Sequence, residues 1–265
     1  LILNFPVSVV GTIDSLWRYP VKSMKGEELE ELFAGYAGVY GDRLFAFRSS
    51  TAPAGFPYFT GRDQRQMIRY RPQFRDREKA ARPINLFAAD QNGAAPLSAS
   101  PEELMIDVET PEGDLFAIDD ARLREILSAG QQKELTLIRS DRAITDCRPL
   151  SLFSLQTAQQ LGAETGVEID KRRFRANVYL DLPNLKAFAE DELVGRSLRL
   201  GAKVVVSIIQ RDSRCMMITL DPDSAEKSPD VLKTVAQGHA GFAGVYGAVV
   251  IEGMLRKGDP VELLD

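Results

Sequence analysis

Short apolar runs, separated by glycine, proline, asparagine and aspartate, recur along the whole chain. Runs of this kind, bounded by turn residues, are typical of β-strands. The chain is therefore predicted to be rich in strands. The runs cover residues 7–13, 43–48, 104–109, 115–118, 135–139, 174–182 and 204–209.

One pair of runs is predicted to form a hairpin. Residues 104–109 and 115–118 flank the sequence Pro111-Glu112-Gly113-Asp114. Proline fixes φ and glycine accepts a positive φ, so the two together suit a tight turn. We expect residues 104–118 to fold back as two antiparallel strands.

Helical patterns are few and short. Asp119 or Asp120 precedes apolar residues three and four apart, which is typical of a capped amphipathic helix. Ser154 is placed to cap a second helix. The predicted helices cover residues 119–130, 154–162 and 229–237, with a less regular pattern at 185–194.

The order of these elements predicts a mainly β fold of the α+β class. Two strand-rich halves meet near Gly130, and such halves are typical of β-barrels or sandwiches with attached helices. We expect an N-terminal β-barrel-like domain at residues 7–128, packed on a second β-barrel domain at residues 129–265, with a few peripheral helices.

Composition narrows the class of protein. The 265 residues are 44% hydrophobic and 27% charged, as in a soluble globular protein, and no run approaches the ~18 apolar residues of a membrane span. Two cysteines make no disulfide framework, so a cytoplasmic location is expected. The single histidine, His239, leaves too few ligands for zinc, and the absence of a Gly-x-Ser-x-Gly elbow argues against a hydrolase.

Residues 62–82 form a basic stretch in an acidic chain. They carry eight Arg or Lys against three Asp or Glu, a local net charge of about +5 in a chain whose net charge is −5. Tyr70 and Phe74 lie within the stretch, as aromatic residues do in a nucleic-acid groove. A solvated charged surface explains the same pattern, and the acidic whole disfavours duplex binding. A polyanion-binding module therefore stays an alternative, with no nucleic acid expected as a partner.

The run Ser213-Arg214-Cys215 carries a single thiol after the apolar residues 204–209. A thiol ligates soft metals or attacks electrophiles only as thiolate, and an adjacent cation such as Arg214 favours that form. Free cysteine is also among the most buried residue types and often packs as a small hydrophobe. The residues alone leave both roles open for Cys215.

Several separate motifs resemble one family. Tyr19-Pro20-Val21-Lys22-Ser23-Met24-Lys25-Gly26, Gly41-Asp42-Arg43 and Thr60-Gly61-Arg62 resemble the N-terminal β-barrel domain of MOSC proteins. Arg173-Phe174-Arg175-Ala176-Asn177, Arg214-Cys215 and Thr219-x-Asp221-Pro222-Asp223 resemble the MOSC domain itself, and residues 244–247 and 255–261 fit its closing strands. The resemblance spans nearly the whole chain.

The resemblance implies a molybdenum cofactor (Mo-molybdopterin) held between the two domains, with Cys215 as the protein ligand to molybdenum. A thiolate suits a soft metal, and the phosphate of the pterin calls for cationic, hydroxyl and backbone N–H donors. By similarity, the cofactor-binding residues are Lys22, Ser23 and Arg43 from the N-terminal domain and Asp146, Arg148, Arg175, Asn177, Ser213, Arg214 and Tyr246 from the MOSC domain.

Other reactive side chains fit the family pattern less closely. Asp146-Cys147-Arg148-Pro149 matches an Asp-rich stretch of the family only loosely. Cys147 either lines the cofactor pocket or is a small buried side chain, and the second is the prediction favoured here. His239 lies in a glycine-rich loop and is interpreted as structural. Asp212 and Asp221 lie close to Cys215 in the sequence and are candidate proton donors, although either also suits a hydrogen-bonded loop.

The resemblance also implies a reaction. Family members related to the mitochondrial amidoxime-reducing component reduce N-hydroxylated compounds, so the small-molecule substrate R–NHOH would become R–NH2 and water. Two cysteines cannot ligate an iron–sulfur cluster, which needs four, so the electrons are expected from a separate donor protein of the ferredoxin or cytochrome kind. In a second hypothesis the protein carries molybdenum cofactor or sulfur, with Cys215 as a persulfide carrier.

Overall fold

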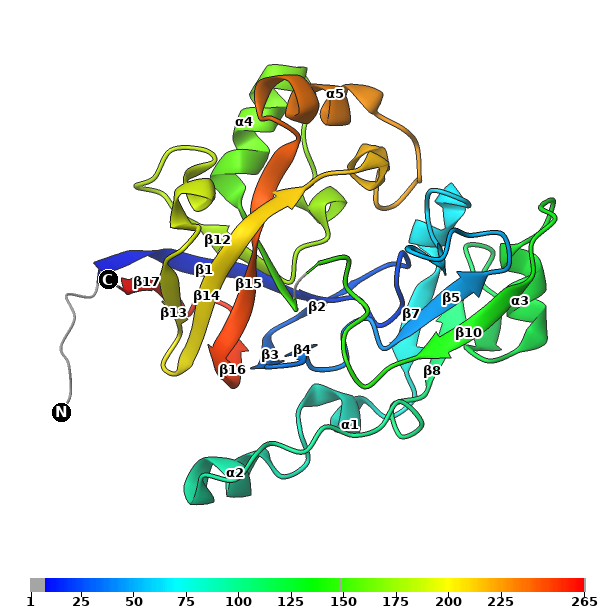
Figure 1. The fold of residues 1–265 in the computed structure, drawn as a ribbon, viewed down its shortest axis with the longest axis horizontal. Helices are drawn as coiled ribbons and strands as arrows, with labels where there is room; N and C mark the ends of the chain where they lie inside the picture. The colour runs from blue at the N-terminus through cyan, green and yellow to red at the C-terminus, as the bar shows by residue number, and fades with distance from the viewer. Residues whose placement is uncertain (1–7, 148, 265) are drawn as a thin grey trace.

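The computed structural model describes residues 8–147 and 149–264 and has the mainly β fold that the sequence predicts (Figure 1). A closed barrel of seven strands forms one half. The strands follow the order β12-β11-β15-β14-β13-β17-β1, and pairing of β1 with β12 closes the ring. They are β1 (Ser8–Arg18), β11 (Leu150–Ser154), β12 (Val178–Asp181), β13 (Ser197–Leu200), β14 (Val204–Ser213), β15 (Phe242–Ile251) and β17 (Pro260–Leu264).

Alternating burial explains why these residues form a barrel. In β14, Val204, Val206 and Ile208 are fully buried, while the residues between them are partly exposed. Successive side chains of a strand point to opposite faces, so one face of each strand fills the barrel. The interior is an apolar core to which Leu198 and Val245 also belong. Polar chemistry must therefore lie outside the barrel interior.

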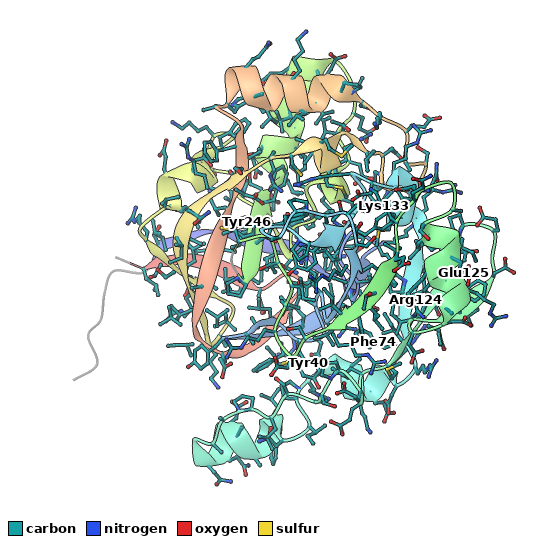
Figure 2. All side chains as sticks on the ribbon, turned by 45° about the vertical axis from the view of Figure 1, so that its right-hand side comes forward. Tyr40, Phe74, Arg124, Glu125, Lys133 and Tyr246 are labelled. Carbon is teal, nitrogen blue, oxygen red and sulfur yellow. The ribbon has the colours of Figure 1, made fainter. Side chains whose placement is uncertain are left out.

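The other half of the molecule is built from three small sheets, with the orders β10-β5-β6, β7-β8-β9 and β16-β3-β4. Tyr40 and Phe74 lie in its apolar core (Figure 2). The strands are β3 (Glu31–Gly35), β4 (Gly38–Val39), β5 (Phe45–Ser49), β6 (Tyr58–Phe59), β7 (Arg71–Phe74), β8 (Ile106–Glu109), β9 (Leu115–Ala117), β10 (Leu135–Arg139) and β16 (Gly253–Arg256), while β2 (Glu27–Leu29) pairs with β1 at the edge of the barrel sheet.

Strands cross between the two halves of the sequence. The first strand, β1, belongs to the barrel that the later strands build. Conversely, β10 lies beyond residue 128 and pairs with β5, and β16 pairs with β3. The division at residue 128 stays a prediction, since the two halves interlock.

The described residues also contain five α-helices and four short 3₁₀ helices. Asp120 and Ser154 cap their helices by accepting hydrogen bonds from backbone N–H groups, as predicted. None of these helices has the length and apolar character needed to cross a membrane. The helices are α1 (Arg77–Ala81), α2 (Leu86–Asn92), α3 (Ala121–Leu127), α4 (Leu155–Thr165), α5 (Pro229–Gly238), η1 (Arg65–Arg69), η2 (Lys171–Phe174), η3 (Ala189–Leu193) and η4 (Met216–Thr219).

Some predicted boundaries were wrong. The strand expected at residues 174–182 begins only at Val178, because η2 and a left-handed Arg175 precede it. The irregular pattern at residues 185–194 yields only η3. The helix expected to end at Gly162 continues to Thr165.

Two further segments differ from the prediction. The first strand continues to Arg18, while Val7 lies outside the described residues. Inside the basic stretch and just beyond it, the chain forms α1 and α2, which the pattern of apolar residues did not indicate.

Candidate functional site

A cavity of about 450 Å³ is lined by residues of both halves of the chain. Figure 2 shows one of them, Tyr246, on the barrel strand β15. Arg148, which the resemblance also assigns to the site, lies outside the described residues. Nine of the residues assigned by resemblance line the cavity, namely Lys22, Ser23, Arg43, Asp146, Arg175, Ser213, Arg214, Cys215 and Tyr246.

Asn177 does not line the cavity but supports a residue that does. Its amide oxygen accepts hydrogen bonds from the backbone N–H and the hydroxyl of Ser151, at 3.3 and 3.0 Å. Its amide nitrogen donates to the carbonyl of Trp17 at 3.2 Å. Since Asn177 is 1% exposed, its place is behind the cavity wall, and Ser151 is the side chain that faces the cavity.

Three of the cavity residues have a left-handed backbone. The φ angles of Ser23, Arg43 and Arg175 are +66°, +48° and +53°. Such values are uncommon for residues other than glycine and cost free energy unless the surrounding structure enforces them. Tyr19 is part of that structure: its carbonyl accepts from the Arg43 N–H at 2.6 Å, and its ring lies 4.8 and 4.3 Å from the guanidinium carbons of Arg43 and Arg175.

Lys22 is a buried cation with a carboxylate partner. It is 6% exposed, donates to the carbonyl of Ile144 at 3.1 Å and forms an ion pair with Asp146. Burial lowers the pKa of Lys22, although Asp146 opposes that shift. Burial alone would raise the pKa of Asp146, but the charge and hydrogen bond of Lys22, together with the charges of Arg43 and Arg62, lower it. This pair keeps one positive and one negative charge at the cavity wall.

Arg43 and Arg175 differ in their partners. Burial lowers the pKa of Arg43, but its ion pair with the fully buried Asp42 outweighs burial and raises that pKa. Arg43 also donates to the carbonyl of Arg175 at 3.0 Å. Arg175 has no carboxylate ion pair within the described residues, and burial lowers its pKa to about 10.

Unpaired donors at this wall indicate an anion site. Among the described residues, the buried Nη2 of Arg175 and Nε of Arg173 have no hydrogen-bond partner. Buried cationic donors are costly unless an acceptor satisfies them. A phosphate or another anion in the cavity would supply that acceptor.

The guanidinium next to Cys215 in the sequence is engaged elsewhere. Arg214 donates to the carbonyls of Ala243 and Phe174, at 2.6 and 2.9 Å, and its Nη2 lies 2.8 Å from a carboxylate oxygen of Asp212. The guanidinium of Arg214 therefore contacts Asp212 and two backbone carbonyls, and its effect on the thiol of Cys215 stays a prediction. Its side chain joins β14, β15 and η2 at the cavity wall.

The cation beside the thiol comes from the other half of the molecule. Burial lowers the pKa of Arg62, but a hydrogen bond with Cys215 and the charge of Asp146 raise it. Gly61 permits the approach, because a Cβ at this position would lie 2.7 Å from the sulfur of Met217. The sequence held a signal for Arg62, since Thr60-Gly61-Arg62 is one of the motifs that resemble the family.

Cys147 is not the small buried side chain that was predicted. It is exposed, lines the cavity, and accepts a hydrogen bond from the amide of Gln210 at 2.9 Å. Cys215 is half-buried on the same cavity and immediately precedes η4. The cavity therefore presents two thiols. Phe56 and Gln210 also line it and were not predicted as site residues.

His239 does not line the cavity. Its Nε2 lies 2.7 Å from a carboxylate oxygen of Glu164, and its ring stacks on Phe188 with 3.7 Å between centroids. These contacts join the ends of α4 and α5 to the segment before η3.

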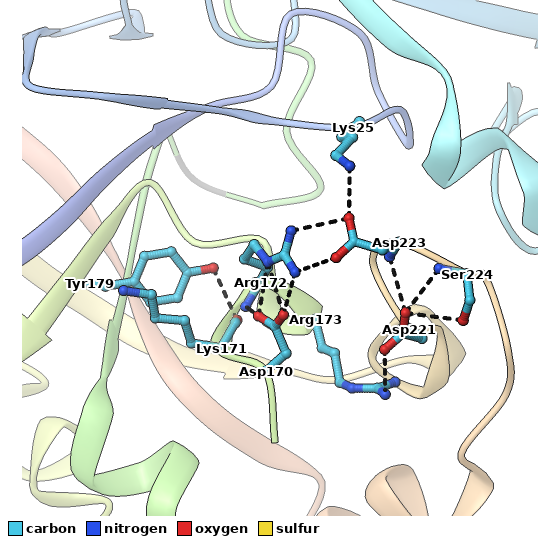
Figure 3. A network of polar contacts seen from close by, with 9 residues as sticks. All are labelled: Lys25, Asp170, Lys171, Arg172, Arg173, Tyr179, Asp221, Asp223 and Ser224. Atoms are coloured by element: carbon cyan, nitrogen blue, oxygen red, sulfur yellow. Dashed lines mark hydrogen bonds and ion pairs between the residues drawn. The ribbon is translucent and has the colours of Figure 1, made fainter. Parts of the chain in front are cut away.

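A network of ion pairs lies beside the cavity and joins three of its segments (Figure 3). Asp223 accepts hydrogen bonds from Lys25 at 2.7 Å and from Arg172 at 2.5 Å. Arg173 forms an ion pair with Asp221 at 3.2 Å. Lys25 follows Lys22 and Ser23 in the sequence, Arg172 and Arg173 precede Arg175, and Asp221 and Asp223 follow Cys215. The network therefore fixes these three segments relative to one another.

Two family models match the chain. The MOSC domain matches residues 139–262, and the MOSC N-terminal beta barrel domain matches residues 10–103. Together they cover more than half of the chain, and both match where the resemblance placed them. The chain belongs to the MOSC family and carries its N-terminal beta barrel domain. MOSC domains are associated with molybdenum-cofactor binding.

The similar solved structures are distant. A crystal structure of YUAD protein from Bacillus subtilis is 15% identical over 98% of this chain and 97% of that chain, with a TM-score of 0.49. YiiM from Geobacillus stearothermophilus is 18% identical over 49% of this chain and 67% of that chain, with a TM-score of 0.36. YiiM from Escherichia coli is 17% identical over 44% of this chain and 55% of that chain, with a TM-score of 0.33. No curated protein matches the chain.

Proposed function

We propose that the cavity binds a molybdenum cofactor and that the protein reduces N-hydroxylated compounds with electrons from a separate donor protein. The observation that supports this most directly is the combination of an unpaired Arg175 guanidinium and the Cys215 thiol on one cavity. An anionic pterin phosphate suits the first, and a soft metal suits the second. We place the protein in the cytoplasm, because Cys147 and Cys215 are both free thiols.

The residues of the chain have distinct parts in this proposal. Lys22, Arg43 and Arg175 would bind the anionic parts of the cofactor, and Cys215 would ligate the molybdenum. When bound, the cofactor supplies the two electrons that cleave the N–O bond. Phe56, at the cavity wall, would contact the apolar part of a small substrate and keep water away from it.

The electron donor would be a separate protein of the ferredoxin or cytochrome kind. The chain contains two cysteines, fewer than the four that an iron–sulfur cluster needs. Electrons would therefore reach the cavity from a docked carrier.

Metal analysis tests the proposal. Protein purified from a host that loads a known molybdoenzyme is expected to contain near-stoichiometric molybdenum and to reduce a simple hydroxylamine with an artificial electron donor. Cys215→Ala should lose the activity, with a fall of at least about 100-fold. Removal of a residue that only supports a metal ligand costs about 10–100-fold, and Cys215→Ala removes the ligand itself. Cys147→Ala is the matched control and should retain its molybdenum. Wild-type protein without molybdenum would contradict the proposal.

A carrier of molybdenum cofactor or sulfur is the second candidate. The exposed Cys147 favours it, because a second thiol on the cavity offers a site to receive sulfur from a Cys215 persulfide. Molybdenum-loaded protein without turnover, together with a persulfide detected by mass spectrometry, would favour the carrier over the reductase.

The basic stretch at residues 62–82 gives little support to polyanion binding. Several of its charges pair with acidic residues of the same half, as in Arg75 with Asp107 at 2.6 Å and Arg71 with Glu109 at 3.4 Å. Paired charges attract a polyanion weakly, so we expect no nucleic-acid partner. A salt-dependent shift in the mobility of an oligonucleotide would overturn that expectation.

A further inference from the structure

Reduction of an N-hydroxylated compound requires protons as well as electrons. The balanced reaction is R–NHOH + 2 e⁻ + 2 H⁺ → R–NH2 + H2O, and the leaving hydroxyl needs a proton as the N–O bond breaks. The residues near Cys215 offer two candidate acids, Asp212 and Asp221. Their surroundings differ in the structure.

Asp221 is occupied by its own loop. One carboxylate oxygen accepts from the N–H groups of Asp223 and Ser224, at 3.1 and 2.9 Å, and from the Ser224 hydroxyl at 3.0 Å (Figure 3). The other forms the ion pair with Arg173. Burial raises the pKa of Asp221, but these hydrogen bonds outweigh it and lower the pKa. Asp221 does not line the cavity, so it closes a loop and holds no transferable proton there.

Asp212 has the opposite surroundings. It lies near the end of β14, is 3% exposed and lines the cavity beside Tyr246 of the neighbouring strand β15. Burial raises its pKa to about 6, and the charge of Asp146 adds to that rise, while Arg214, Arg43 and a hydrogen bond with Tyr246 oppose it. A carboxyl group in this range is protonated at mildly acidic pH and partly protonated near neutrality, so it can hold a proton for donation to a substrate.

We propose that Asp212 is the general acid of the reductase, donating its proton to the hydroxyl oxygen of the substrate as the N–O bond breaks. This inference rests on the proposed function. The carboxylate that forms stays 2.8 Å from the Arg214 guanidinium, which stabilises the new negative charge. The second proton goes to the nitrogen from solvent, water returns a proton to Asp212, and the donor protein supplies both electrons.

The other acidic groups of the cavity are less suitable. Asp146 forms an ion pair with Lys22, which lowers its pKa and keeps it ionised. Burial raises the pKa of Tyr246 above its ordinary value, which already lies well above neutrality, so its hydroxyl retains its proton. Asp212 is thus the cavity-lining group best matched to proton donation at working pH.

Infrared difference spectroscopy on cofactor-free protein tests the protonation state without turnover. A carboxylic C=O band that appears as pH falls through about 6 is expected in the wild type and in Asp221→Asn, the rival acid. The band should be absent in Asp212→Asn. Persistence of the band in Asp212→Asn, or its appearance in no form of the protein, would overturn the proposal.

Kinetics of the molybdenum-loaded protein test the role. Asp212→Asn should keep its molybdenum content and its KM, lose about 100-fold or more in kcat, and lose the fall in rate with rising pH. Asp212→Glu should regain part of the rate. If Asp212→Asn retains the activity of the wild type, the role of Asp212 as general acid is refuted, while the reductase function is not. A loaded wild type without any turnover would refute the reductase and the role of its acid together.

Discussion

At the scale of single residues, the cavity concentrates conformations and charges that folding disfavours. Ser23, Arg43 and Arg175 each have a positive φ, which costs on the order of 1–3 kcal/mol per residue when the surroundings do not compensate. Arg175 adds a cation without a carboxylate partner among the described residues. Because these costs fall on residues of one cavity, they are best explained by a ligand that repays them on binding.

Arg175→Met tests this explanation. The folded protein lowers the pKa of Arg175 to about 10, below its ordinary value, so at neutral pH the cation costs more in the folded than in the unfolded state. Cofactor-free Arg175→Met should therefore unfold roughly 2 °C or more above the wild type, while its molybdenum content falls about tenfold or more. Calorimetry and metal analysis measure the two effects.

Arg172→Met is the control for Arg175→Met. Arg172 pairs with Asp170 and Asp223, at 2.6 and 2.5 Å, so its loss should lower the unfolding temperature rather than raise it. An Arg175→Met protein with the molybdenum content of the wild type would show that Arg175 does not contact the cofactor.

Nine of the eleven site residues that the resemblance predicts line the cavity, because their motifs are local. The sequence could not assign their contacts. Arg214 adjoins Cys215 in the sequence, yet its guanidinium bonds to Ala243 and Phe174, while Arg62 approaches the thiol from the other half. Cys147 was predicted to be buried from the general tendency of free cysteine, although the charged Asp146 and Arg148 flank it, and only the fold brings it to the cavity.

At the scale of elements, ion pairs fix the segments that carry the site. Asp223 joins the segment after Cys215 to Arg172 of η2 and to Lys25 of the other half (Figure 3). The hydrogen bond with Arg172, more than that with Lys25, lowers the pKa of Asp223 to about 2. A carboxylate bound by two cations positions all three segments at once.

Asp223→Asn is expected to loosen the site with little loss of stability. Exposed ion pairs contribute about 0–1 kcal/mol, so the unfolding temperature should change little at neutral pH. The stabilisation is present above the unfolded pKa of about 4 and disappears as pH falls through about 2, so wild type and variant should converge in acid. Release of the cofactor, measured by the fluorescence of its pterin, should be several-fold faster in the variant at neutral pH.

Asp230→Asn, on the exposed first turn of α5, is the matched control for Asp223→Asn and should release the cofactor at the wild-type rate. Equal release rates for all three proteins would argue that the network has no part in holding the cofactor.

The accuracy of the element predictions follows from how local each signal is. The hairpin of β8 and β9 was predicted correctly because proline and glycine fix its turn, and Gly113 has the expected positive φ. The strand expected at residues 174–182 was wrong in its first part. There the backbone is set by Arg175, which turns at the cavity wall, and no local pattern encodes that requirement.

At the scale of the whole molecule, the barrel closes only through the first strand of the chain. Residues of β1 pair with β12 on one side and with β17 on the other, as in Thr12 with Asp181 and Ser8 with Leu263. The backbones of β1 and β12 approach closely where they pair, since a Cβ at Gly11 would lie 2.0 Å from the carbonyl oxygen of Asp181. The sequence predicted two β-rich halves but not this exchange, because strand pairing over such a separation leaves no periodic signal.

The exchange predicts how the separated halves behave. A fragment of residues 129–265 lacks β1, so its barrel would keep two open strand edges at β12 and β17. Alone, it is expected to show no cooperative thermal transition by circular dichroism. Addition of the fragment 1–128, which supplies β1 and β3, should restore a single transition, at a temperature that rises with the concentration of the fragments. A sharp transition for residues 129–265 alone would instead show that this half folds independently of β1 and that residue 128 is a true domain boundary.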